Sequence, residues 1–194
     1  MLERIPSVLG RALRGVRSDA TRLVYNDAAL IAVPASIRLT SRAFSDRGAL
    51  PARFTADGAG VSPPLAWDDA PAATAELVLL IEDPDAPMPH PLVHAVAWGL
   101  RGRSGALAEG ALSKAGEHRT EVRAAALGRN SYLSREYLPP DPPPGHGTHH
   151  YAFQLFALGE PARFLTSPGR SALTEQLRAH TLAKGLLIGT YTRS

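Results

Sequence analysis

Cysteine is absent from the 194-residue sequence. Disulfide bonds, thiolate nucleophiles and Cys-ligated zinc are therefore excluded, and we expect a reducing, cytoplasmic location. Long apolar runs are absent too. Runs such as Leu77–Ile81 and Leu92–Val96 fall far short of the roughly 20 residues that a transmembrane helix needs. We expect no membrane span.

The sequence has little net charge, formally +3. Residues 1–24 contain five arginines, one glutamate and one aspartate, so this segment accounts for the whole excess. The remaining chain is neutral and has no basic run. We therefore expect no nucleic-acid partner.

The length and composition predict an ordinary globular protein with one main domain. The sequence is 44% hydrophobic and 20% charged, and its 17 glycines and 17 prolines interrupt it often. Alternating or continuous apolar residues predict a first strand near Ile37 and Leu39. Later strands are expected at 76–82, 91–100, 151–158 and 186–191, and a helix capped by Ser171 precedes the last of them. The predicted fold class is mainly β.

Residues 1–24 have the pattern of an amphipathic helix. Ile5, Val8, Leu9, Leu13 and Val16 recur at helical spacing, and most arginines lie on other faces. Three explanations compete: a targeting peptide, a membrane-surface helix, and a helix that packs on the domain or on a second subunit. We favour packing, with a role in dimer formation. The expected organisation is a helical extension and linker, 1–35, followed by one domain, 36–194.

Three polar residues adjoin apolar strands and are candidates for a site. Asp83 ends an apolar run in the segment DPDAP, where two prolines restrict the backbone. His94 shares strand parity with Val96 and Trp98, and we expect its ring on their face. His149 likewise shares parity with Tyr151. A turn aspartate and two hydrogen-bonded core histidines are the structural alternative.

If the three side chains converge, they form a small polar pocket for an anion. Imidazoles donate hydrogen bonds, and Asp83 favours their protonated forms. The same groups could also act as acid and base catalysts. A metal site would draw on Asp83, Asp85, His146, His149 and His150, but no HExxH helix is present, and we expect no metal and no cofactor.

The long stretch from about 101 to 148 has few apolar residues and no sustained periodicity. Such loops in compact domains are usually functional. It ends in the residues GHGTHH, which run directly into a predicted strand.

Several blocks resemble the phosphatidylethanolamine-binding proteins, also called the Raf kinase inhibitor-like family, in their bacterial branch. They follow one another in the family's order from about residue 37 to the end. The blocks are Phe54, Thr55, Asp57 and Gly58; Ser62, Pro63, Pro64, Leu65 and Trp67; DPDAP at 83–87; His94; Gly128, Asn130 and Tyr137; Pro142, Pro143, Gly145, His149 and Tyr151; and Gly189, Thr190, Tyr191 and Arg193.

The resemblance implies a β-sandwich-like fold with a large and a smaller antiparallel sheet, peripheral helices, and a shallow pocket for phosphate-like head groups. Its implied ligand-binding residues are Asp83, Asp85, Pro87, His94, Tyr137, Pro142, Pro143 and His149. The resemblance also implies a binding or regulatory role, acting on a kinase or a protease, and a homodimer.

The sequence departs from the family at the loop after Tyr137. Pro139 stands where a glycine is common, and Asp141 stands where Cys or Gly is usual. A carboxylate close to a bound anion would oppose its binding, so we expect Asp141 to turn outward to solvent.

Three hypotheses about function follow. The first is a non-enzymatic binding protein for a small anion or phosphorylated head group. The second is a hydrolase or transferase that uses the same residues as acid and base. It would need a placed water, a metal, or a hydroxyl such as Ser131 or Tyr137, and the sequence nominates none of these clearly. The third is an interaction protein whose partner surface includes the amino-terminal helix.

Overall fold

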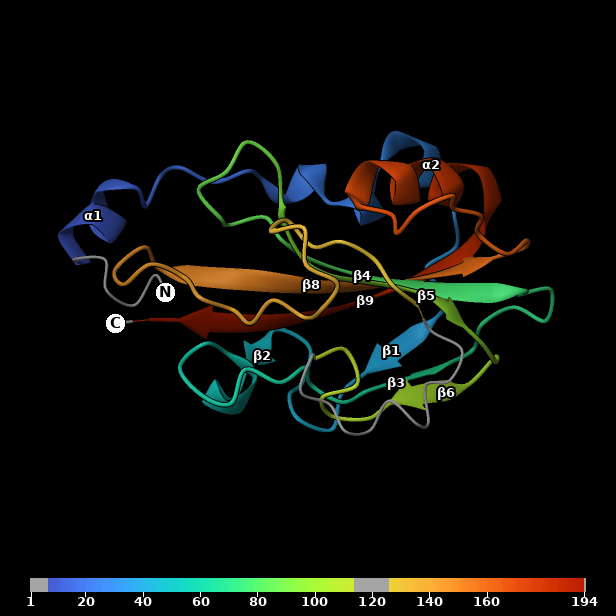
Figure 1. Ribbon diagram of the computed structural model, residues 1–194, viewed down its shortest axis with the longest axis horizontal. Coiled ribbons are helices and arrows are strands. Elements are labelled where there is room, and N and C mark those ends of the chain that lie inside the picture. The colour runs from blue at the N-terminus through green and yellow to red at the C-terminus, as the bar shows by residue number, and fades with distance from the viewer. Residues whose placement is uncertain (1–6, 114–125, 194) are drawn as a thin grey trace.

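The computed structural model describes residues 7–113 and 126–193, and two β-sheets dominate it (Figure 1). The larger sheet has the strand order β2-β9-β8-β4-β5-β7, and the smaller has the order β1-β3-β6. The large-sheet strands are β2 (Gly48–Ala49), β4 (Glu76–Asp83), β5 (Leu92–Leu100), β7 (Ala126–Leu127), β8 (Thr148–Leu158) and β9 (Thr181–Thr192). The small-sheet strands are β1 (Arg38–Thr40), β3 (Leu65–Asp68) and β6 (Gly105–Leu107).

Every strand that the sequence predicted is present. The long antiparallel neighbours β4, β5, β8 and β9 form the centre of the large sheet, and only β2 pairs in parallel, with β9. The predicted functional loop at 101–148 is not structureless, because it contributes β6 and β7. Residues 114–125 of that prediction lie outside the described residues.

The large sheet is covered on both faces (Figure 1). The small sheet packs on one face, and the helix α2 (Arg170–His180) with three short helical turns packs on the other. These turns are η2 (Ala20–Arg22), η3 (Val24–Asn26) and η4 (Ala28–Leu30). Because both faces are covered, every residue of β4 is buried, which explains its continuous apolar sequence.

Two clusters of buried side chains correspond to the two layers. Leu79, Ile81 and Phe153 belong to the core between the sheets. Val78, Leu80 and Phe156 belong to the core beneath α2. The helix begins at Arg170 after Gly169, so the prediction that Ser171 caps it is wrong by two residues.

The predicted amphipathic helix is much shorter than its sequence pattern suggested. The described part contains α1 (Ser7–Ala12), and a turn follows before η2. Its apolar side chains Val8, Leu9, Leu13 and Val16 are all exposed. Packing of this stripe on the domain is therefore wrong for the described residues. Residues 1–6, including Ile5, lie outside them.

A further short helical turn, η5 (Ala52–Phe54), lies between β2 and β3. It places the Phe54 carbonyl where it accepts a hydrogen bond from Tyr137 Oη at 3.0 Å. This bond ties η5 to the loop before β8, whose Tyr137 belongs to the core between the sheets.

Candidate functional site

A buried chain of hydrogen bonds lies at the end of the large sheet where β4 finishes and β8 begins. Asp83 Oδ2 accepts a bond from His149 Nδ1 at 2.7 Å. His149 Nε2 lies 2.7 Å from His146 Nδ1, and His146 Nε2 donates to the Leu13 carbonyl at 2.8 Å. All three side chains of this chain are buried. The predicted pairing of Asp83 with His149 is present as a direct hydrogen bond.

The acceptors at the two ends determine which ring nitrogens donate there. The carboxylate of Asp83 and the Leu13 carbonyl only accept, so the ring nitrogens that face them donate. Burial lowers the pKa of His146, and the nearby His149 adds to this shift while the Leu13 carbonyl opposes it. The two rings are thus fixed between the Asp83 carboxylate and the backbone at Leu13.

His94 lies near this chain but makes a different contact. Its Nδ1 donates to the Leu138 carbonyl at 2.6 Å, and its ring meets the Tyr151 ring edge-on with centroids 5.1 Å apart. Tyr151 in turn stacks near His149, at 6.4 Å between centroids. The structure thus brings Asp83, His94 and His149 into one buried cluster, with Tyr151 between the two histidines.

A β-bulge directs His94 into this cluster. Ile81 pairs with Ala95 and Glu82 pairs with Val93, which leaves His94 as the extra residue of β5. Simple alternation predicts that His94 shares a face with Val96, which belongs to the core beneath α2. That prediction is wrong, because the bulge turns His94 toward Tyr151 in the core between the sheets.

Two buried polar atoms of the cluster have no hydrogen-bond partner among the described residues. They are His94 Nε2 and Tyr151 Oη. Buried polar groups are nearly always hydrogen-bonded, because leaving one without a partner costs about 1–3 kcal/mol. Unpartnered atoms on neighbouring rings indicate a place where a small polar molecule can bind.

Burial lowers the pKa of His94, although Asp83 and the Leu138 carbonyl oppose the shift and His149 adds to it. An unfolded chain takes up a proton at this histidine below its ordinary value of 6.5, whereas the folded chain does not. We therefore expect stability to be lost as the pH falls from 6.5 toward the lower folded pKa. Chemical denaturation at pH 7.5 and 5.5 checks this, and His94→Gln should make the difference smaller. An unchanged difference would contradict it.

A segment far away in the sequence covers the cluster. We call residues 7–18 the strap; its α1 helix lies beside the start of β8 and the end of β9 (Figure 1). Arg17 contacts the Asp85 carboxylate and donates to the carbonyls of Thr148, at 2.9 Å, and His146, at 3.1 Å. Together with the Leu13 carbonyl on His146, these contacts close the site.

The strap also packs very closely on the loop before β8. A Cβ atom on Gly10 would lie 2.0 Å from the Pro144 carbonyl oxygen, so only glycine fits there. From the opposite side, Gly145 has a φ of 78° and faces the Ser7 carbonyl. Backbone contact of this kind requires glycine on both segments.

Asp85 is occupied by protein groups. Its Oδ2 accepts from the His150 backbone N–H at 2.7 Å and lies 2.8 Å from His150 Nδ1. Burial works against ionisation, but these bonds and Arg17 together hold the pKa of Asp85 below its ordinary value. The carboxylate is therefore ionised at neutral pH and anchors the strap.

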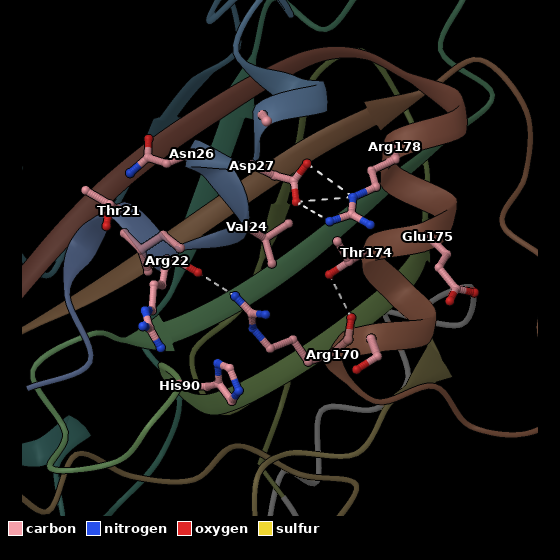
Figure 2. Close-up of a pocket in the computed structure, with 13 residues that line it drawn as sticks. Thr21, Arg22, Val24, Asn26, Asp27, His90, Arg170, Thr174, Glu175 and Arg178 are labelled. Carbon is pink, nitrogen blue, oxygen red and sulfur yellow. Dashed lines mark hydrogen bonds and ion pairs between the residues drawn. The ribbon is translucent and has the colours of Figure 1, made fainter.

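The described residues also contain a cavity of about 500 Å³ on the other face of the large sheet, between α2 and η2–η4 (Figure 2). None of Asp83, His94 and His149 lines it. Its charged groups bind protein partners: Arg178 pairs with Asp27 at 2.7 Å, and Arg170 with the buried Glu82 at 2.6 Å. We therefore place the candidate site at the histidine cluster.

Comparison of the sequence with models of protein families shows which family the chain belongs to. The family profile described as "Phosphatidylethanolamine-binding protein" matches residues 40–192. The chain belongs to the phosphatidylethanolamine-binding protein family. A match of this extent includes the whole histidine cluster but not the strap.

Relatives of this family member occur in archaea and bacteria. A protein of Methanothermobacter thermautotrophicus is 34% identical over 157 residues, covering 81% of this chain and 99% of that protein. One of Pyrococcus horikoshii is 32% identical over 153 residues, covering 79% and 75%. The Mycobacterium tuberculosis relative named as lipoprotein LppC is 36% identical over 157 residues, covering 80% and 72%.

Solved structures of the family share the fold. A Chlamydia trachomatis homolog of the phosphatidylethanolamine-binding proteins has a TM-score of 0.71 at 31% identity, covering 82% of this chain and 99% of that chain. Escherichia coli YbcL has a TM-score of 0.74 at 24% identity, covering 82% and 100%. The expected mainly β fold with two sheets and peripheral helices is confirmed.

The other residues that the family resemblance suggested surround the cluster without all facing it. Tyr137 is buried, but its hydroxyl bonds the Phe54 carbonyl. The carbonyls of Pro142 and Pro143 accept from Arg193 and from the His146 backbone. Pro87 is half-buried in the β4–β5 connection. Tyr137 and the two prolines thus support the loop before β8.

Asp141 does not turn outward to solvent as expected. Its Oδ1 pairs with Arg193 Nη1 at 2.5 Å, and its side chain is only 19% exposed. Arg193 also pairs with Asp57 at 2.7 Å. The charge of Asp141 is offset by an ion pair and not by hydration, a partner that the local proline-rich sequence could not reveal.

Sequence reasoning named His146 only as a possible metal ligand and did not assign a site role to Arg17 or Tyr151. His146 belongs to the motif GHGTHH, where glycines flank it on both sides, and this was the available signal. No sequence signal pointed to Arg17, because its partner Asp85 is 68 residues away. Among the described residues, no three His, Asp or Glu side chains are arranged to hold a metal ion.

Within residues 7–113 and 126–193, no helix is both long and apolar enough to cross a membrane.

Proposed function

We propose that this family member is a non-enzymatic binding or regulatory protein whose histidine cluster holds a small anionic or phosphorylated head group. The observation that carries the proposal is the pair of buried, unpartnered atoms, His94 Nε2 and Tyr151 Oη. They lie beside a hydrogen-bonded Asp83–His149 pair. A ligand oxygen between them would satisfy both atoms.

The contacts of the two nearby carboxylates support an anion. Asp83 accepts a hydrogen bond from His149, and Asp85 pairs with Arg17 and bonds His150. Tyr151 can donate its hydroxyl proton, and an anion beside His94 would favour the protonated, donating form of that ring. Both nearby carboxylates are therefore engaged by protein groups before a ligand arrives.

Removal of the Tyr151 hydroxyl tests the proposal. Tyr151→Phe should weaken binding of inorganic phosphate and glycerophosphoethanolamine about tenfold, because one hydrogen bond to a charged group is lost. The free energy of unfolding should not fall and should rise by up to about 1–3 kcal/mol, since the substitution removes a buried hydroxyl that has no protein partner. Calorimetry and denaturant titration measure the two quantities.

Tyr137→Phe is the matched control. Its hydroxyl bonds the Phe54 carbonyl, so its removal should cost about 1 kcal/mol of stability and leave phosphate affinity unchanged. Equal phosphate affinity in the wild type and Tyr151→Phe would exclude the site. The phosphate affinities of the wild type and of Tyr151→Phe should also be measured with Gly10→Ala added to each protein, because this substitution loosens the strap.

The two hydroxyls named for the hydrolase or transferase alternative are engaged away from the cluster. Ser131 Oγ accepts from the Val93 backbone N–H at 2.8 Å, and the Tyr137 hydroxyl is engaged with Phe54. Neither contact leads to the Asp83–His149 pair. We therefore prefer the binding role.

The protein partners and the cellular location are inferred from the family and the composition. We propose a homodimer and modulation of a kinase or protease, as the family resemblance suggests. The absence of cysteine supports a cytoplasmic location. The M. tuberculosis relative is named a lipoprotein, so fractionation of cells that produce the protein is the direct test.

A further inference from the structure

The strap presents its large apolar side chains outward. Val8 is 65% exposed, Leu9 55%, Val16 49% and Leu13 36%. Four such residues within nine positions form an apolar strip at one end of the molecule. Scattered single apolar residues are normal on protein surfaces, but a contiguous group indicates a binding surface.

The inward face of the strap is made of other groups. Gly10 packs on the Pro144 carbonyl, the Leu13 carbonyl accepts from His146, and Arg17 reaches over Asp85. Backbone and polar contacts therefore hold the strap in place. The apolar side chains are not used for this attachment, although burying them would be the usual reason for an amphipathic helix.

The charged groups beside the apolar strip indicate what binds there. Arg11 and Arg14 are exposed, although Arg14 also donates to the Gly145 carbonyl at 3.1 Å, and residues 7–18 contain no acidic side chain. A second copy docked through the same strip would bring these arginines near their own equivalents. A surface of anionic phospholipids instead offers negative charge beside an apolar layer.

We propose that the outward face of the strap is a docking surface for an anionic phospholipid bilayer. Val8, Leu9, Leu13 and Val16 enter the boundary between head groups and acyl chains, and Arg11 contacts the lipid phosphates, while Arg14 adds positive charge from its place on the Gly145 carbonyl. This surface is separate from the ligand site, and its test does not depend on the proposed function.

Sedimentation of the full chain with vesicles at low salt tests the proposal. The protein should pellet with vesicles of phosphatidylcholine and phosphatidylserine, and at least about tenfold more weakly with phosphatidylcholine alone. Val8→Ser with Leu9→Ser should reduce binding to the anionic vesicles about tenfold or more. Arg11→Gln, which leaves the bond of Arg14 to the Gly145 carbonyl in place, should reduce it about fivefold.

Matched variants elsewhere on the surface provide the control. Ile31→Ser with Leu165→Ser removes two exposed apolar side chains, and Arg42→Gln with Arg135→Gln removes two exposed charges. Both should bind vesicles like the wild type. Binding that is lost equally in strap and control variants, or absent in the wild type, overturns the proposal.

The oligomeric state separates the lipid from a second copy. Light scattering should give the same mass for the wild type and for Val8→Ser with Leu9→Ser. A dimer that dissociates in this variant, with vesicle binding unchanged, would assign the strip to a second copy and overturn the proposal.

Discussion

Gly10→Ala is expected to expose the histidine cluster. The added Cβ would lie 2.0 Å from the Pro144 carbonyl oxygen and 3.0 Å from its carbon, so the strap must move away from the loop before β8. His146 and His149 would then contact solvent more often. Their modification by diethylpyrocarbonate, followed by mass spectrometry, should become about tenfold faster or more.

Gly15→Ala is the matched control in the same segment. No atom lies within 4 Å of a Cβ at Gly15, so the histidines should react as slowly as in the wild type. Arg17→Ala provides a second way to open the site, because it removes the contacts with Asp85 and with the carbonyls of Thr148 and His146. Equal reaction rates in all four proteins would show that the strap does not close the cluster.

Opening the strap should also change ligand binding. A site that is accessible only part of the time binds with an apparent affinity reduced by the open fraction. Phosphate should therefore bind more tightly to Gly10→Ala than to Gly15→Ala. This comparison links the closure to the proposed function, whereas the modification rates depend on the structure alone.

Glu82→Ala is expected to cause the largest loss of stability. Glu82 is fully buried, and its carboxylate accepts from Arg170, from Gln154 Nε2 at 2.8 Å and from the Val24 backbone N–H at 3.0 Å. The substitution leaves these donors unpaired beneath α2. Removing one partner of a buried ion pair costs about 3–5 kcal/mol, which denaturant titration measures.

Asp68→Ala is the control for the buried pair. Asp68 pairs with Arg38 at 2.6 Å between exposed side chains, so its loss should cost about 0–1 kcal/mol. Similar costs for the two substitutions would show that Glu82 is not the anchor that joins η3, α2 and β8.

The strands were predictable because their signals are local. The apolar run that ends in Asp83 forms β4, and its continuous pattern fits a strand covered on both faces. Parity correctly placed His149 with Tyr151, since β8 pairs in regular register with β9 there. The family resemblance, carried by motifs from Phe54 to Arg193, also led to the correct fold.

The predictions that were wrong concern residues whose orientation depends on contacts with residues far away in the sequence. A bulge against β4 reoriented His94, and no count along β5 could show it. Asp141 forms an ion pair with Arg193, which is 52 residues away in the sequence, and this partner offsets its charge. Arg17 found Asp85, 68 residues away, and the helical pattern of its segment predicted the wrong buried face. Periodicity reports which residues share a face of an element, whereas only tertiary packing decides which face meets the rest of the molecule.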